Sequence, residues 1–201
     1  NTIYMCNKLD SFRPTHLLVG GALLLTATAC GGQKWSEVEK DSIRIVTQPG
    51  GPTLGYSATS GVKLLTVDGF AFKDLNRDGK LDPYEDWRLT PEERSVDLAA
   101  QLSVEEIAGL MLYSAHQSIP GASKGFGAST YNGKPFDESG AAASDLSDAQ
   151  RKFLVEDNVR HVLVTRVQSP EVAARWNNNV QALVESIGHG IPANNSSDPR
   201  H

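Results

Sequence analysis

The hydrophobic pattern becomes regular after residue 89, where capped helices can be predicted. Thr90-Pro91-Glu92-Glu93 has the form of a capping box and predicts a helix that continues to about Leu102. Ser103-Val104-Glu105-Glu106 repeats the device and predicts a second helix. Apolar residues follow at helical spacing and are expected to form its buried stripe: Ile107, Leu110 and Met111.

A strand, a helix and a second strand are predicted in the last forty residues. Residues 159–164 are rich in β-branched side chains, as a buried parallel strand requires. Ser169-Pro170-Glu171 then begins a helix with apolar positions on one face: Ala173, Trp176, Val180, Leu183, Val184 and Ile187. Residues 191–197 predict a shorter strand that ends at Asp198. This order is a βαβ unit with two parallel strands, which cannot close a barrel, so we expect the chain to be incomplete.

The remaining segments have weaker patterns. Residues 31–68 predict a spacer followed by a weak strand pattern, and Asp82-Pro83 predicts a short helix over 84–88. Residues 113–147 are rich in Gly, Ala and Ser, which predicts either a functional loop or a poorly ordered insertion. The sequence therefore divides into four predicted segments. They are a signal over 1–30, a spacer over 31–68, a loop with a short helix over 69–88, and part of a larger domain over 89–201.

The first thirty residues have the order of an export signal. Lys8 and Arg13 precede the apolar run LLVGGALLL at 17–25, which is too short to span a bilayer. Small residues then lead to Cys30, which resembles the lipid-attachment cysteine of a bacterial lipoprotein signal. We expect an exported protein of the periplasm or the cell envelope, attached to a membrane through lipidated Cys30. The alternative is ordinary signal cleavage that leaves Cys30 as an incidental thiol.

Composition narrows the possible partners. The formal net charge is −5 with 21% charged residues, which argues against a nucleic-acid partner. Only two cysteines are present, and Cys6 would be lost with the signal, so a disulfide framework is excluded.

Residues 74–85 match the EF-hand template D-x-[DN]-x-[DN]-G-x₅-E at each specified place. A hard cation such as Ca²⁺ needs several oxygens at alternating positions and a glycine at the sharp turn, here Gly79. The expected ligands are Asp74, Asn76, Asp78, the carbonyl of Lys80, Asp82 and Glu85. The alternative is a metal-free Asx turn. A second loop is missing from the sequence, which favours a structural calcium staple over a dockerin-like module or a calcium sensor.

An ordered set of short motifs resembles the opening of bacterial glycoside hydrolases of family 3. The set is YEDWR at 84–88, LSVEEIAGLM at 102–111, WNN at 176–178 and GIP at 190–192, followed by SDPRH at 197–201. Ala108 departs from the usual Lys or Val of that family. The resemblance implies an α/β fold in which this chain begins a (β/α)₈ TIM barrel with its first two strands only, ahead of an α/β sandwich domain.

The resemblance also implies a function. Family members release non-reducing terminal β-D-glucosyl or related residues from oligosaccharides or β-glucosides by a retaining double displacement. The aspartate matching Asp198 accepts hydrogen bonds from sugar hydroxyls, and Arg200 and His201 are expected to line the same rim. The nucleophile and the acid/base are expected beyond His201, so no catalytic residue is assigned and this piece is expected to be inactive alone. A small binding lipoprotein without catalysis is the alternative.

Overall fold

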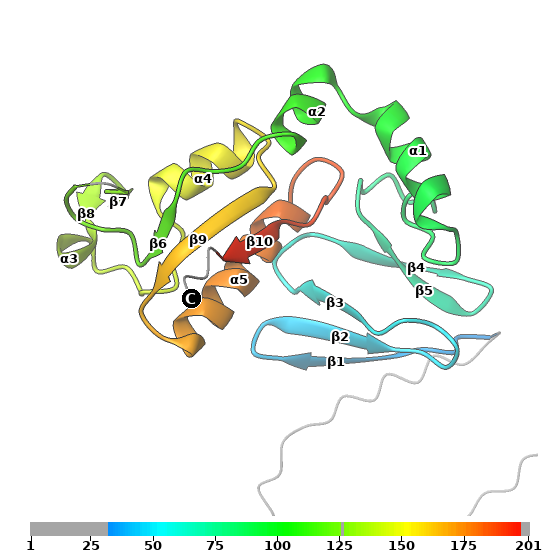
Figure 1. The fold of residues 1–201 in the computed structure, drawn as a ribbon. Helices are drawn as coiled ribbons and strands as arrows, with labels where there is room; N and C mark the ends of the chain where they lie inside the picture. Colours follow the sequence, from blue (N-terminus) through cyan, green and yellow to red (C-terminus); the bar gives the residue numbers. More distant parts are fainter. Residues whose placement is uncertain (1–31, 126, 198–201) are drawn as a thin grey trace, which may run out of the picture. The chain divides into compact units, whose positions relative to one another are not determined.

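The computed structural model describes residues 32–125 and 127–197. Cys30, Asp198, Arg200 and His201 lie outside the described residues, so the predictions made for them stay predictions. The described chain is mixed α/β and contains several small sheets (Figure 1). In this part of the protein, no helix combines the length and the apolar character that crossing a membrane would require.

The first structured segment is built from five antiparallel strands. β1 (Ser36–Lys40), β2 (Ile43–Thr47) and β3 (Leu54–Ser57) form one sheet, and β4 (Lys63–Val67) pairs with β5 (Phe70–Asp74) in a hairpin. A small apolar core joins them: Val46, Tyr56, Val62 and Ala71. The spacer predicted over 31–68 therefore contains four strands. Its pattern was weak because β1 is exposed along its whole length, so it has no apolar face to reveal it.

Both predicted capping boxes are confirmed. Helix α1 (Pro91–Gln101) begins at Thr90, whose hydroxyl accepts from the Glu93 amide, and α2 (Val104–Leu110) begins at Ser103 in the same way. The prediction of a short helix over 84–88 is wrong. Consecutive turns occupy that segment, with the amides of Glu85 and Asp86 bonded to the Asp82 carbonyl.

The buried stripe predicted for α2 is also wrong. Ile107 is 40% exposed and Met111 is 79% exposed, so this face has little cover in the described chain. The buried residue of α2 is Gly109, where a Cβ atom would lie 2.4 Å from the Asp157 carbonyl oxygen. The helix backbone at Gly109 thus packs against the turn at 157–158, which precedes the strand that begins at His161, and this close approach needs glycine.

The last part of the chain forms a parallel sheet of order β10-β9-β6. Its strands are β6 (Gln117–Ile119), β9 (His161–Val167) and β10 (Asn194–Ser197). The two neighbouring parallel strands predicted near the end are β9 and β10, paired from His161–Asn194 to Val164–Ser197, and this prediction is confirmed. The predicted number of parallel strands, two, is wrong, because β6 adds a third parallel strand within the predicted loop. With only three residues, β6 is too short to show a periodicity.

The rest of the predicted loop is also partly ordered. β7 (Thr130–Tyr131) and β8 (Lys134–Pro135) form a hairpin that leads to the short helix α3 (Phe136–Ser139). The Asp148 carboxylate accepts from the Thr130 hydroxyl at 2.6 Å and from the Asn132 and Gly133 amides at 2.9 Å each. The hairpin is therefore tied to the first residue of a later helix, α4 (Asp148–Val155).

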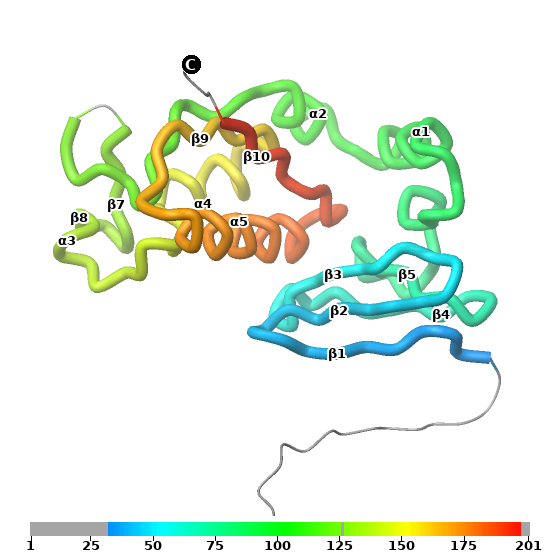
Figure 2. The backbone as a smooth tube through the Cα atoms, turned by 60° about the horizontal axis from the view of Figure 1, so that its bottom comes forward, coloured from blue at the N-terminus to red at the C-terminus, as the bar shows by residue number. Residues whose placement is uncertain are grey.

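Two helices cover one face of the parallel sheet. α4 (Asp148–Val155) is the last element in the connection from β6 to β9, and α5 (Pro170–Glu185) connects β9 to β10; Figure 2 shows both helices on the same side. Their apolar faces meet the sheet in one core: Ile119, Leu146, Leu154, Val162, Trp176, Val180, Val184 and Ala193. Within this sheet the strands lie in the order in which the chain supplies them, and each connection ends with a helix on the same face. No closed barrel forms from the described strands, so the barrel itself stays a prediction.

Candidate functional site

The three parallel strands bring their carboxyl ends to one edge of the sheet. Ile119 at the end of β6 pairs with Val167 at the end of β9, and Ser197 at the end of β10 pairs with Val164. Parallel α/β sheets bind ligands at this edge, because the loops that follow the strands gather there. The predicted sugar-binding residues follow directly after Ser197 in the chain, but they lie outside the described residues.

The segment after β6 reaches this edge through defined hydrogen bonds. The Gly121 amide donates to the Tyr131 hydroxyl at 2.8 Å, and the Gln168 amide donates to the Ile119 carbonyl at 2.9 Å. Burial raises the pKa of the Tyr131 hydroxyl above its ordinary value. This tyrosine is thus a neutral acceptor at neutral pH, and it fixes the start of the long connection that follows β6.

The face of the sheet opposite α4 and α5 carries polar and aromatic side chains. Val162 is fully buried among the helices, so His161 beside it points to the other face. There the Asn194 side chain lies 3.3 Å from His161 Nδ1, and the Tyr113 ring stacks on His161 with centroids 5.1 Å apart. These contacts give His161 a packing role on this face.

Trp176 and Trp87 both pack against neighbouring residues. Trp176 is 3% exposed, and its indole N–H donates to the Gln150 side chain at 3.0 Å. Trp87 stacks on Phe72 with centroids 5.1 Å apart and donates to the Ala71 carbonyl at 3.0 Å. Neither indole is presented as an open platform for a ligand.

The predicted calcium loop is a closed turn with its side chains hydrogen-bonded to its own amides. Asp74 Oδ2 accepts from the Gly79 amide at 3.2 Å across the loop. Glu85 Oε1 accepts from the Leu75 amide at 2.6 Å and from the Asn76 amide at 3.2 Å, and its Oε2 accepts from the Asp82 amide at 3.2 Å. Gly79 has a φ of +79°, which its lack of a Cβ permits.

The other loop side chains are arranged in Asx turns. Asn76 Oδ1 accepts from the Asp78 amide at 3.1 Å, and Asp78 Oδ1 accepts from the Lys80 amide at 2.8 Å. Asn76 Nδ2 donates to Asp82 Oδ2 at 2.6 Å. Within the described residues, no three His, Cys, Asp or Glu side chains converge into a group that could hold a metal ion. The calcium assignment is therefore still a prediction.

Two buried carboxylates of the loop have no positively charged partner in the part of the chain that the structure describes. Asp74 is 2% exposed and Glu85 is 4% exposed, yet no Lys, Arg or His among the described residues forms an ion pair with either carboxylate. Burial raises the pKa of Glu85, although the amides of Leu75, Asp82 and Asn76 oppose that rise. Asp74 Oδ1 is buried and has no hydrogen-bond partner. Buried carboxylates are normally paired or bound to a metal.

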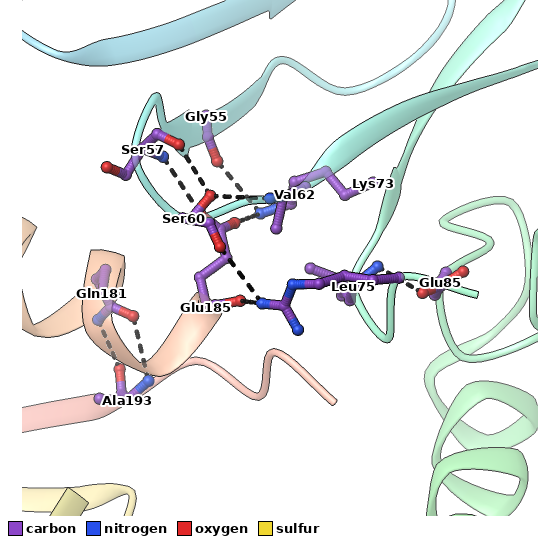
Figure 3. Close-up of polar contacts among 11 residues, drawn as sticks. Gly55, Ser57, Ser60, Val62, Lys73, Leu75, Glu85, Gln181, Glu185 and Ala193 are labelled. Carbon is purple, nitrogen blue, oxygen red and sulfur yellow. Dashed lines mark hydrogen bonds and ion pairs between the residues drawn. The ribbon is translucent and has the colours of Figure 1, made fainter. Parts of the chain in front are cut away.

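A polar cluster that the sequence did not reveal lies between the β-rich segment and α5 (Figure 3). Lys73 Nζ and Glu185 Oε1 are 2.5 Å apart, and the other Glu185 oxygen accepts from the Ser57 amide at 3.3 Å. Arg77, inside the calcium loop, donates to the Glu185 backbone carbonyl at 2.7 Å and to the Ser60 carbonyl at 3.4 Å. More than one hundred residues separate Lys73 or Arg77 from Glu185, so no local spacing could have predicted these contacts.

The sequence of the chain was compared with the sequences of known proteins. No family model matches the chain. Over 144 residues, which are 71% of the chain, it is 41% identical to a periplasmic beta-glucosidase/beta-xylosidase of Dickeya chrysanthemi. The chain is similar to a segment of a glycosidase. The resemblance predicted from the sequence motifs is thereby confirmed, and the chain spans 19% of the length of this relative.

Proposed function

We propose that the chain is part of an exported glycoside hydrolase of family 3 that releases terminal β-D-glucosyl or β-D-xylosyl residues. The observation that carries this proposal is the 41% identity to a periplasmic beta-glucosidase/beta-xylosidase over 144 residues. At this level of identity a shared fold and a related reaction are the natural expectation, whereas the preferred sugar depends on a few pocket residues.

The topology is compatible with the barrel start that the resemblance implies. In a (β/α)₈ barrel each strand lies beside its predecessor, and each connecting helix packs on the outer face. The described sheet has the sequential order β6, β9, β10, and its helices α4 and α5 share one face. A doubly wound sheet would instead reverse its strand order and place helices on both faces.

Within this proposal, Asp198 binds the non-reducing sugar. It follows β10 directly, and a carboxylate can accept charge-assisted hydrogen bonds from two adjacent hydroxyls. Arg200 and His201 line the same rim. The nucleophile and the acid/base of the retaining mechanism lie elsewhere in the whole protein, and no residue of this chain is assigned to them.

The test is hydrolysis of p-nitrophenyl β-D-glucoside and β-D-xyloside by the full-length protein. NMR of the first turnover products should show the β-anomer, because a retaining double displacement preserves the configuration at the anomeric carbon. An α-anomer as first product would contradict the retaining mechanism. Absence of hydrolysis of either glycoside by folded full-length protein would contradict the proposed function.

Export is the second part of the proposal. The relative is described as periplasmic, and the first thirty residues have the charged, apolar and small-residue order of a signal. Lipid attachment at Cys30 adds a membrane anchor to this expectation. Metabolic labelling with a palmitate analogue should mark the wild-type protein and leave Cys30→Ser unlabelled. Label retained on Cys30→Ser would contradict attachment at this residue.

A further inference from the structure

We infer that residues 74–85 form a Ca²⁺ site whose occupation holds the β-rich segment to the carboxyl-terminal end of α5. This inference does not depend on the proposed glycosidase activity, because it concerns the binding of an ion and the stability of a contact. It starts from the loop itself and then follows the loop's outer contacts.

The first argument is the charge buried in the loop. Asp74 and Glu85 are both at least 96% buried, and no basic side chain in the described chain pairs with them. Taking two carboxylates out of water without a counter-charge is costly, and a bound divalent cation removes that cost. The cation supplies what the surrounding side chains do not.

The second argument is the unused oxygen of Asp74. Its Oδ1 is buried and has no hydrogen-bond partner, whereas Oδ2 accepts from Gly79 on the opposite side of the loop. One oxygen of the buried carboxylate is therefore free for a ligand. Buried acceptors without a partner are rare and call for an explanation, and a cation is the ligand that a carboxylate oxygen suits.

The third argument is the set of oxygen donors that the loop carries beside Asp74, whose side chains are hydrogen-bonded within the loop and would turn inward to bind an ion. Asn76, Asp78, Asp82 and Glu85 supply only oxygen-bearing groups, which Ca²⁺ prefers over transition metals. Asp78 is exposed and Asp82 is half-buried, so both side chains can exchange an amide donor for an ion without disturbing the apolar core. The inference assigns these residues, with the Lys80 carbonyl, as the ligands.

The loop also holds α5 from outside. The Arg77 guanidinium donates to the carbonyl of Glu185, the last residue of α5. Lys73, just before the loop, pairs with the Glu185 carboxylate (Figure 3). Leu75 lies against Gly190, where a Cβ atom would come within 2.9 Å of the leucine side chain. An ion that fixes residues 74–85 thus fixes two residues that contact the end of α5 and the segment leading to β10, Arg77 and Leu75, and it also restrains Lys73 immediately before them.

The test of binding is calorimetric titration of the full chain with CaCl₂ after treatment with a chelator. We expect a saturable heat with one site, and a higher Tm in 1 mM Ca²⁺ than in 1 mM EGTA. Asp78→Ala should lower the affinity by at least about tenfold, and its exposed position makes folding of this variant a fair expectation. The matched control is Asp68→Asn, an acidic residue outside the loop whose side chain is 71% exposed, and it should bind like wild type.

The test of coupling is hydrogen exchange at the end of α5, where the Ser186 and Gly190 amides are hydrogen-bonded. Ca²⁺ should slow their exchange in the wild type and leave it unchanged in Asp78→Ala. Arg77→Ala should still bind Ca²⁺ but should lose most of this effect. Arg77 has a φ of +66°, and arginine and alanine both carry a Cβ, so the substitution does not change the backbone strain at this position.

Two results would overturn the inference. Absence of Ca²⁺-dependent heat and of any Tm difference in folded wild-type protein would remove the site. Calcium-dependent protection of α5 that is undiminished in Arg77→Ala would remove the link through this residue. Neither result bears on glycoside hydrolysis, which is measured separately on the full-length protein.

Discussion

Lys73 on β5 and Glu185 on the last turn of α5 form an ion pair of 2.5 Å across 112 residues of sequence. Glu185 is 8% exposed, and its second oxygen accepts from the Ser57 amide. The pair therefore joins two segments that have separate apolar cores.

Glu185→Gln should destabilise the protein by about 1–3 kcal/mol, because it removes one charge of a largely buried pair and leaves the Lys73 ammonium without its partner. Urea unfolding measures the effect. The control is Glu39→Gln at the exposed Arg44–Glu39 pair, which should change the free energy of unfolding by less than about 0.5 kcal/mol. Equal effects of the two substitutions would contradict the importance of the buried contact.

Leu154→Ala should cost about 2–5 kcal/mol, since this fully buried side chain of α4 lies in the core beneath the parallel sheet. Val155→Ala, one residue later on the same helix, is a suitable control because Val155 is 44% exposed. Its expected cost is below about 0.5 kcal/mol. If both variants unfold at the same urea concentration, the proposed packing of α4 on the sheet is wrong.

The hairpin β7-β8 should loosen in acid through Asp148. The hydrogen bond from Thr130, helped by the amides of Gly133 and Asn132, lowers the pKa of Asp148. A lowered pKa in the folded state stabilises the contact above the ordinary Asp value of about 3.9, and this stabilisation is lost as pH falls through the folded pKa. The NMR amide signals of Asn132 and Gly133 should report a titration midpoint below that ordinary value.

Asp148→Asn should remove this titration, whereas Glu138→Gln, an exposed substitution in the same segment, should leave it in place. A midpoint at or above the ordinary Asp value would show that Asp148 does not hold the hairpin in its charged form.

Asp198→Asn in the full-length protein should lower kcat/KM for aryl β-glucosides by about 10²-fold or more. The amide that replaces the carboxylate loses charge-assisted hydrogen bonds to the sugar, each worth roughly 1.5–3 kcal/mol. Steady-state kinetics with unchanged Tm would support the role of Asp198 as a sugar ligand. Wild-type kinetics in the variant would contradict it.

Local signals in the sequence predicted the local structure well. Thr90, Ser103 and Ser169 all begin helices as expected, because each side chain accepts from an amide in the first turn of its own helix. The parallel pairing of β9 and β10 followed from the βαβ pattern. These features depend only on neighbouring residues or on one short connection.

Features that depend on distant partners were missed. β6 has three residues, and its place is decided by the β9 edge to which it pairs. The contacts of Glu185 could not be predicted, since a glutamate at the end of an amphipathic helix is ordinarily a solvated residue. The predicted sugar and lipid sites lie outside the described residues, so the sequence is still their only support within this chain.

Gly109 occupies a position at which no larger residue fits. Because the Gly109 backbone lies so close to Asp157 and Asn158, even an added methyl group would collide with the turn that leads into β9. Exposed neighbours such as Val104 can change with little consequence. A change at position 109 would instead require the opposing turn to be rebuilt at the same time, which ties the variation of these two distant segments together.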